Sequence, residues 1–291
     1  MSDYTEIRID ADYLRPILSH RENVSHKGDY GHLLIVAGCQ NMPGAAVLAT
    51  GAALKSGCGL VTLHSTERAL QAAVNSCPSA ILSEDPDICF SRVPDSIGRY
   101  SAIAVGPGLG RKPQTLDAFS SLLSFSLKDK VPMVLDADAL NLLSSNPTLL
   151  DFIPDGSVLT PHMGELERFS SSSFSGGADE IASELSSRTR SVVVLKGYQS
   201  RVFTPDRRLL VNTTGNPGMA KGGSGDVLTG LIGGLLARGY RSIDAAALGV
   251  WIHGRAGDFM TEVCTAEAYN SSDLIDSLWE GFVYLERGKD Q

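Results

Sequence analysis

The sequence predicts an α/β fold in which a mostly parallel central sheet is covered by helices on both faces. Short apolar runs, rich in β-branched residues, alternate with stretches of helical periodicity. The runs cover residues 32–36, 59–64, 102–106, 131–136, 157–160 and 192–196. Strands that are apolar on both faces and separated by helices are typical of parallel sheets buried between helical layers.

Helices are expected between these runs, at residues 44–56, 67–75, 115–123, 137–143 and 178–187. Residues 201–203 and 209–212 flank a Thr-Pro-Asp-Arg turn, which predicts a hairpin. From Asp226 onward the pattern is mostly helical, and residues 282–291 are expected to form a fraying tail. Glycines recur in the first of these helices, at Gly230, Gly233 and Gly234. We expect them to let another helix, such as 245–257, approach closely.

Composition indicates a single domain spanning residues 1–291. A chain of this length with 43% hydrophobic residues can bury a large core. No composition break is long enough for an interdomain linker, and residues 170–177 are expected to form a surface loop. The net charge of −8 argues against nucleic acid as a partner, because such binding needs basic surface.

Several signals for secretion, membranes and metals are missing from the sequence. We recognise no signal peptide, and no eighteen uncharged apolar residues follow one another. The five cysteines form no C-x-x-C pair, which favours free thiols. We therefore expect a cytoplasmic protein without membrane contact. A P-loop, an H-E-x-x-H metal motif, a nucleophile elbow and a kinase H-R-D set are also missing, which excludes several enzyme classes.

A glycine-rich segment, NPGMAKGGSGDVLTG, carries the strongest chemical signal. It places Gly222, Gly223, Ser224 and Gly225 directly before an amphipathic helix. Successive backbone N–H groups at a helix N-terminus form an anion-binding nest, and glycine allows phosphate to approach the backbone. We expect these four residues to form an anion hole, with Lys221 adding positive charge at its rim.

Asp226 follows this nest at the start of the helix. Aspartate is common there as a cap or as a partner of the helix dipole, which gives a purely structural explanation. The alternative is a general base that takes a proton from a substrate hydroxyl as its oxygen attacks phosphorus. A carboxylate beside a phosphate cradle favours the catalytic interpretation.

The segment resembles the anion-hole signature of the ribokinase-like superfamily. Within that superfamily the chain is similar to the NAD(P)H-hydrate dehydratases over about residues 27–258. Four more segments support the resemblance in order: GHLLIVAG, GPGLG, DADALN and TPHMGE. The resemblance implies a ribokinase-like fold and repair of hydrated NADH or NADPH. In that reaction a nucleoside phosphate phosphorylates the ring hydroxyl, and the phosphate is then eliminated.

The resemblance also assigns residues. Asp226 matches the catalytic base, and Gly225 matches a contact to the nucleotide phosphate. The segment matching the nucleotide site consists of Lys196, Gly197, Tyr198, Gln199 and Ser200. A strand-end lysine with a solvated ammonium group is the alternative for Lys196.

Contacts to the hydrated dinucleotide are implied at Ala45, Gly108 and His162, together with Asp226. Each position also has a structural alternative. Ala45 could serve helix packing, Gly108 could form a tight turn, and His162 could be a hydrogen-bonded loop histidine. Without the resemblance, packing would be the interpretation of Ala45 and a loop histidine that of His162. The other histidines have no ligand-like spacing, and we interpret them as structural or surface residues. These are His20, His26, His32, His64 and His253.

Mg²⁺ is the implied metal. Asp136 and Asp138 would hold it through water at the carboxyl edge of the sheet, with Asn141 fixing the loop. Helix capping competes for Asp138. One departure from the family is Met163, at a position where the segment often carries proline.

ADP is the expected phosphate donor, ATP the alternative, and the expected assembly is a homotetramer. With about thirty residues before the first expected strand, we foresee no fused epimerase and predict a separate NAD(P)H-hydrate epimerase as pathway partner. Two other functions stay open: a ribokinase-like kinase of a vitamin-precursor alcohol, and a non-catalytic nucleotide-binding regulator. The segments 106–110 and 160–165 favour the dehydratase over the kinase, and Asp226 argues against a pure binder.

Overall fold

A ten-stranded sheet is the backbone of the fold in the computed structural model, which describes residues 5–170 and 174–288. Its strand order is β1-β10-β9-β8-β7-β6-β5-β2-β3-β4. The strands are β1 (Thr5–Ile9), β2 (His32–Val36), β3 (Leu60–Thr66), β4 (Ile81–Asp85), β5 (Ala102–Val105), β6 (Met133–Leu135), β7 (Val158–Leu159), β8 (Val192–Leu195), β9 (Arg201–Phe203) and β10 (Arg208–Asn212). Only β9 pairs antiparallel to its neighbours, within the described residues. The mostly parallel sheet predicted from the apolar runs is confirmed.

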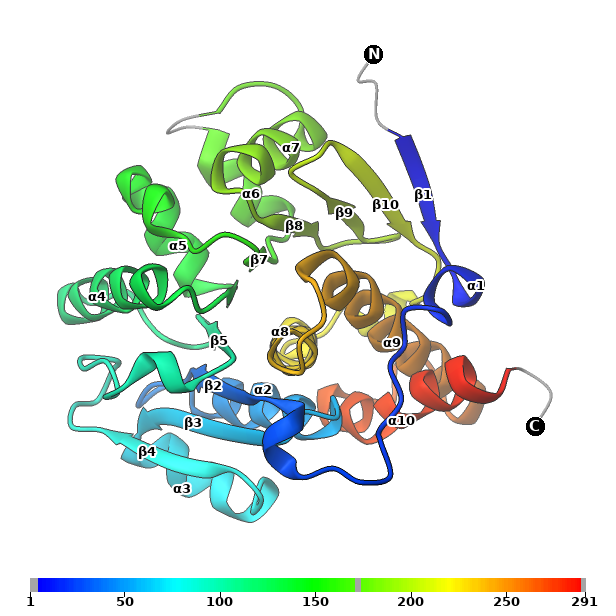
Figure 1. The fold of residues 1–291 in the computed structure, drawn as a ribbon, viewed down its shortest axis with the longest axis horizontal. Coiled ribbons are helices and arrows are strands. Elements are labelled where there is room, and N and C mark those ends of the chain that lie inside the picture. Colours follow the sequence, from blue (N-terminus) through cyan, green and yellow to red (C-terminus); the bar gives the residue numbers. More distant parts are fainter. Residues whose placement is uncertain (1–4, 171–173, 289–291) are drawn as a thin grey trace.

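Helices cover both faces of this sheet, as predicted (Figure 1). They are α1 (Ala11–Leu14), α2 (Pro43–Lys55), α3 (Glu67–Ser76), α4 (Pro113–Asp129), α5 (Asp138–Ser145), α6 (Met163–Ser170), α7 (Ala178–Thr189), α8 (Ser224–Ala237), α9 (Ser242–Val263) and α10 (Ser271–Arg287). One core layer joins the sheet to α2, α3, α8, α9 and α10. The other joins it to α4, α5, α6 and α7. Alternate strand residues enter alternate layers: Leu33 faces the first and Leu34 the second.

Some elements differ from the sequence-based expectation. β1, β4 and α6 were not predicted at all. The expected tail at 282–291 is wrong for residues 282–287, which complete α10. The expected loop 170–177 begins at the last residue of α6, and residues 171–173 lie outside the described part of the chain. The predicted hairpin is confirmed as the antiparallel pair β9–β10.

Gly230 and Gly234 of α8 face α2, which corrects the expectation that α9 is their partner. Gly233 faces the sheet instead, where a Cβ atom would lie 3.0 Å from Cβ of Ala104. A Cβ atom on Gly230 would lie 1.9 Å from the carbonyl oxygen of Ala49, and one on Gly234 would lie 1.9 Å from Oγ of Ser56. α8 and α2 therefore touch backbone to backbone. α9 approaches α8 through its own Gly249, where a Cβ would lie 2.5 Å from Cγ1 of Ile232.

All five cysteines are free thiols, as predicted. Cys39, Cys77 and Cys89 are buried, and Cys58 and Cys264 are half-buried. None of the helices in the described ranges has the length and apolar character needed to cross a membrane.

Candidate active site

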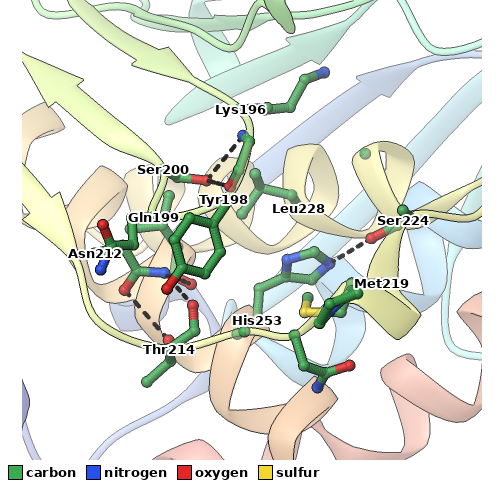
Figure 2. Close-up of a pocket in the computed structure, with 18 of the residues that line it drawn as sticks. Lys196, Tyr198, Gln199, Ser200, Asn212, Thr214, Met219, Ser224, Leu228 and His253 are labelled. Atoms are coloured by element: carbon green, nitrogen blue, oxygen red, sulfur yellow. Dashed lines mark hydrogen bonds between the residues drawn. The ribbon is translucent and has the colours of Figure 1, made fainter. Parts of the chain in front are cut away.

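A cavity of about 760 Å³ opens where β8 and β10 end and α8 begins. Its walls come from the end of β8, the loop after β10, the first turns of α8 and one face of α9 (Figure 2). The predicted site residues that line it are His162, Lys196, Gly197, Tyr198, Gln199, Ser200, Gly222, Ser224 and Gly225. The structure thus brings the predicted nucleotide segment and most of the anion hole into one space.

The glycine-rich loop has the geometry of an anion nest. Gly223 is the N-cap of α8 and adopts φ +91°, a left-handed conformation that glycine tolerates. A Cβ atom there would lie 2.4 Å from Cδ1 of Leu48. Within the described residues no side chain caps the N-terminus of α8. The N–H of Ser224 donates to the carbonyl oxygen of Lys221 at 3.4 Å, and the N–H groups of Gly225 and Asp226 are available to a ligand.

Asp226 lies in the first turn of α8 and carries a perturbed carboxyl group. Burial raises its pKa to about 7, the negative charge of Asp136 adds to the rise, and Lys196 partly opposes it. Within the described residues its carboxylate forms no hydrogen bond, so it does not act as a hydrogen-bonding helix cap. A half-buried carboxyl group that titrates near neutral pH beside a phosphate nest has the properties of a general base.

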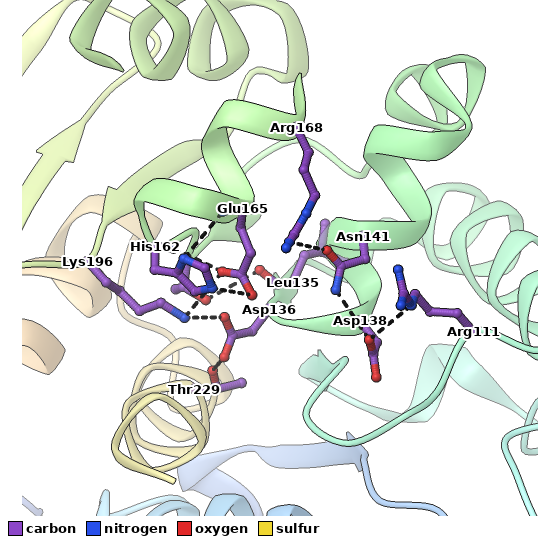
Figure 3. Close-up of polar contacts among 11 residues, drawn as sticks. Arg111, Leu135, Asp136, Asp138, Asn141, His162, Glu165, Arg168, Lys196 and Thr229 are labelled. Atoms are coloured by element: carbon purple, nitrogen blue, oxygen red, sulfur yellow. Dashed lines mark hydrogen bonds and ion pairs between the residues drawn. The ribbon is translucent and has the colours of Figure 1, made fainter. Parts of the chain in front are cut away.

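Lys196 sits in a buried ion cluster rather than in solvent. Its Nζ lies 2.6 Å from Oδ1 of Asp136 and 3.8 Å from Oε2 of Glu165 (Figure 3). Thr229 donates a hydrogen bond of 2.7 Å to the second oxygen of Asp136. Burial alone would lower the pKa of Lys196, but the two carboxylates outweigh it and raise the pKa. The interpretation of Lys196 as a solvated strand-end lysine is therefore wrong.

The cluster also lies against the nest. A Cβ atom on Gly225 would lie 3.4 Å from Nζ of Lys196. Glycine at this position therefore leaves the ammonium group directly beside the first turn of α8. A phosphate bound in the nest would meet both backbone N–H groups and a fixed positive charge.

The two aspartates that follow β6 have different partners. Asp136 is engaged by Lys196 and Thr229. Asp138 accepts hydrogen bonds from the backbone N–H of Gly110 at 2.8 Å and from Nδ2 of Asn141 at 3.3 Å. Asp138 thus links the loop after β5 to the first turn of α5, and the hydrogen bond from Asn141 holds its carboxylate in place.

The carboxylates at this edge of the sheet suit a Mg²⁺ ion that arrives bound to the nucleotide, rather than one held by protein side chains alone. Among the described residues no group of three or more histidine, cysteine or carboxylate side chains could hold a metal. The buried carboxylates of Asp136 and Glu165 could contact the ion through water. Mg²⁺ commonly keeps several water ligands and needs only one or two carboxylates besides the phosphates.

The three predicted contacts to the hydrate fall into two groups. A Cβ atom on Gly108, which has φ +60°, would lie 2.8 Å from Cβ of Ala45, so these two residues touch. They are not among the residues lining the 760 Å³ cavity. His162 lines that cavity and forms a β-bridge with Lys196. Its Nδ1 accepts a hydrogen bond of 3.3 Å from the backbone N–H of Glu165.

His253 is a site residue that the sequence analysis missed. It lines the cavity, and its Nε2 lies 3.3 Å from Oγ of Ser224 at the nest (Figure 2). Burial, with the nearby Lys196 charge, lowers its pKa to about 4, so the imidazole is neutral at physiological pH. In the sequence His253 is a single histidine within an apolar helix, with no second polar residue at ligand-like spacing. Its place in the site becomes visible only when α9 packs on α8.

Lys221 does not place its charge at the rim of the nest, contrary to the expectation. Its ammonium group donates to three backbone carbonyl oxygens of the segment that links α9 to α10. His64, interpreted as structural or surface, is structural: it is buried and lies 3.3 Å from Asp85.

Comparisons with known proteins identify the family of the chain. The family model described as NAD(P)H-hydrate dehydratase matches residues 33–279. The chain belongs to the NAD(P)H-hydrate dehydratase family. A curated relative, the ADP-dependent (S)-NAD(P)H-hydrate dehydratase of Bacillus subtilis, is 34% identical over 280 residues, covering 93% of this chain and 97% of the relative.

Another family relative is longer than this chain. The bifunctional NAD(P)H-hydrate repair enzyme of Moorella thermoacetica is 37% identical over 284 residues, which cover 93% of this chain and 52% of that protein. The chain thus spans about half the length of the first curated relatives that it matches.

A family structure has the same fold. The Bacillus subtilis ADP/ATP-dependent NAD(P)H-hydrate dehydratase, co-crystallised with ATP/Mg²⁺, superimposes with a TM-score of 0.79 at 29% identity. The match covers 96% of this chain and 98% of that one. The ribokinase-like α/β fold implied by the resemblance is confirmed.

The departure from the family at Met163 has a simple structural setting. Met163 is the first residue of α6 and is 42% exposed. Proline is favoured at the first position of a helix because its missing N–H is not needed there. Methionine fits the same position, and the neighbouring His162–Glu165 hydrogen bonds are intact.

Proposed function

We propose that this chain is an ADP-dependent (S)-NAD(P)H-hydrate dehydratase. It converts hydrated NADH or NADPH and ADP to NAD(P)H, AMP and phosphate, and thus acts as a hydro-lyase on a kinase-like site. The observation that carries the proposal is Asp226, a carboxyl group with a pKa near 7 directly after the phosphate nest. The name of the Bacillus subtilis relative supports the same reaction.

Asp226 would take the proton of the ring hydroxyl as its oxygen attacks the terminal phosphorus. The new O–P bond forms while the bond between phosphorus and the leaving nucleotide oxygen breaks. The ring C–O bond then breaks and phosphate leaves, while the adjacent ring carbon loses a proton and the dihydropyridine is restored. A general base of this kind contributes about 10²–10⁴-fold to the rate.

The anion hole of Gly222, Gly223, Ser224 and Gly225 would stabilise the charge on the transferring phosphoryl group. Lys196 supports this role, because its ammonium group is already held beside Gly225. The segment Lys196, Gly197, Tyr198, Gln199 and Ser200 would bind the rest of the nucleotide. The Tyr198 side chain is 86% exposed at the cavity and would stack on the adenine base.

Ala45, Gly108 and His162 would bind the hydrated dinucleotide, with its reactive ring at Asp226. The contact between Ala45 and Gly108 leaves backbone at the carboxyl edge of the sheet for a sugar or phosphate to approach. Mg²⁺ would enter with the nucleotide and neutralise phosphate charge. Asp136 and Glu165 are the carboxylates that would face it through water.

The test is the return of NADH absorbance when hydrated NADH, Mg²⁺ and ADP or ATP are incubated with the protein. We expect recovery with ADP, and a loss of about 10²–10⁴-fold in kcat for Asp226→Asn. Asp117→Asn, an exposed change on α4, serves as the matched control and should keep full activity. Tight ADP binding without recovery would contradict the dehydratase and leave the vitamin-precursor kinase or the nucleotide-binding regulator, which a screen for alcohol phosphorylation separates.

The wider setting of the reaction also follows from the proposal. We propose that the enzyme works in the cytoplasm, as a homotetramer, beside a separate epimerase that interconverts the two hydrate stereoisomers. Supplying only the unreactive hydrate stereoisomer should give slow recovery, and adding an epimerase should accelerate it. Equal rates on both isomers without an epimerase would contradict the need for that partner.

A further inference from the structure

Lys221 lies next to the phosphate nest but directs its charge away from it. Its Nζ donates to the carbonyl oxygens of Ala266 at 2.7 Å, Glu267 at 3.1 Å and Tyr269 at 2.5 Å. The same atom lies 4.5 Å from the centroid of the Tyr269 ring. Its three donors are thus matched by three neutral carbonyl groups. In the described ranges no carboxylate forms an ion pair with it.

Lys221 is half-buried, and backbone carbonyl oxygens take the place of part of the water around its ammonium group. Removing an ammonium group from water is unfavourable unless strong hydrogen bonds replace the lost hydration. A ring of backbone carbonyl oxygens is the ligand set with which proteins replace the hydration shell of small monovalent cations. The ammonium group of Lys221 therefore occupies a cage that is chemically suited to a cation of single charge.

The cage belongs to the segment 264–270, which joins α9 to α10 and lies against the nest loop. Tyr269 donates a hydrogen bond of 2.9 Å to the side chain of Asn216, and Ser271 donates one of 2.8 Å to the carbonyl oxygen of Gly222. A Cβ on Gly218 would lie 2.8 Å from the carbonyl oxygen of Ala266, so the two segments touch. Lys221 provides the charged link among these contacts.

We propose that Lys221 is a positioning residue: a built-in monovalent cation that fixes the segment 264–270 against the loop and thereby holds Gly222–Gly225 in the conformation that binds nucleotide phosphate. The proposal deepens the proposed function and rests on it. It also predicts that the natural enzyme needs no monovalent cation of its own at this place.

Lys221→Ala tests the proposal by emptying the cage. We expect the Kd for ADP, measured calorimetrically without hydrate, to rise about tenfold, because several charge-assisted hydrogen bonds that shape the nest are lost. The Kd for the hydrate measured without nucleotide should change much less. Lys128→Ala, an exposed change in the last turn of α4, is the matched control and should leave both constants unchanged.

Cation rescue separates positioning from general stabilisation. At constant ionic strength, K⁺ or NH₄⁺ should restore ADP affinity to Lys221→Ala, since each fits among carbonyl oxygens. Tetramethylammonium is too large for the cage and should not restore it. The wild type should respond equally to all three salts. Lys221→Met, which keeps the length of the side chain, should lose affinity like Lys221→Ala but should respond less to K⁺, because its side chain still fills the cage.

The outcomes distinguish this proposal from the proposed function. Unchanged ADP affinity in folded Lys221→Ala, or equal rescue by tetramethylammonium, would overturn the positioning role whatever the reaction is. A wild type that binds ADP but restores no NADH would overturn the dehydratase alone. If Lys221→Ala does not fold, hydrogen exchange on Lys221→Met decides, since the proposal requires faster exchange at the amides of Gly222–Gly225.

Discussion

The unusual chemistry of Asp226 comes from its neighbours. Burial and the negative charge of Asp136 together raise its pKa to about 7, although Lys196 opposes the shift. At this value the carboxyl group is ionised often enough to accept a proton and basic enough to hold it.

The first prediction at this scale concerns the pH–rate profile. With ADP saturating, kcat/KM for the hydrate should rise with pH and level off above an apparent pKa of about 7, since only ionised Asp226 accepts the proton. Initial rates between pH 5.5 and 8.5 measure it. Residual turnover by Asp226→Asn should lack this rise, and a rise retained in the variant would assign the titration to another group.

A second prediction concerns stability. Because the folded-state pKa of Asp226 lies above its unfolded value of 3.8, the folded protein keeps this proton between about pH 4 and 7 while the unfolded chain releases it. This carboxyl group therefore lowers the free energy of unfolding as pH rises through that window. Asp226→Asn removes this pH dependence. The unfolding free energy of the variant minus that of the wild type should therefore be about 2–3 kcal/mol larger at pH 8 than at pH 5.

Urea unfolding of both forms at the two pH values gives this difference directly. Asp117→Asn, on the exposed face of α4, is the control. If the difference in unfolding free energy between variant and wild type is the same at pH 8 as at pH 5, the folded environment does not disfavour the Asp226 charge.

At the residue scale, the sequence revealed the groups that stand in a local pattern. Asp226 and the nest follow one another along the chain, so glycine spacing and helix periodicity located them. His253 meets Ser224 only because α9 packs on α8, and the ammonium group of Lys221 meets carbonyls more than forty residues further along. Contacts of that kind depend on tertiary packing, which local pattern does not encode.

Among the elements, the contact between α8 and α2 decides the position of the nest. Gly230 has no space for a side chain, since a Cβ would lie 1.9 Å from the carbonyl oxygen of Ala49. The nest opens α8 and Ala45 lies at the start of α2. The same close approach therefore sets the distance between the proposed phosphate site and the proposed hydrate site.

Gly230→Ala should destabilise the protein by about 1–3 kcal/mol, because α2 must move to admit the methyl group. Helix propensity alone predicts the opposite sign, a gain of roughly 1 kcal/mol. Gly44→Ala in α2, where a Cβ meets nothing within 4 Å, is the matched control and should be neutral or stabilising. Thermal melts of both variants decide, and an equal response would exclude a rigid backbone contact.

The elements that the sequence predicted are the apolar strands inside the sheet. β1 and β4 escaped because they are its two edges, where strands need not be apolar throughout. The burial pattern of β4 is typical of an edge strand: the apolar residues Ile81 and Leu82 are exposed, and the polar residue Asp85 is buried. Polar residues such as Glu84 interrupt its hydrophobic pattern, so periodicity does not distinguish it from a loop.

For the whole molecule, this β4 edge bears on the proposed tetramer. Val74 and Leu82 are exposed by 49% and 39% and line the same shallow hollow where α3 meets β4, and Ile81, at the start of β4, is 46% exposed. Proteins seldom leave an apolar sheet edge uncovered. We therefore expect a second copy of the chain to cover it.

Leu82→Lys should reduce the mass of the assembly measured by sedimentation, because a buried lysine at the contact would be unpaired. Phe125 of α4 is 48% exposed, and Phe125→Lys serves as the control, which should leave the mass unchanged. A Leu82→Lys variant with the wild-type mass would place the subunit contact elsewhere.

The pairing of β1 with β10 has a consequence for how the chain folds during synthesis. Thr213, just after β10, donates a hydrogen bond to the carbonyl oxygen of Ile9 across 204 residues of sequence. At translation rates of about 5–20 residues per second, β1 leaves the ribosome roughly 10–40 s before that partner exists. β1 is therefore the first strand of this sheet to be synthesised but among the last to pair, and a chaperone acting on the nascent chain would meet β1 as an unpaired strand throughout that interval.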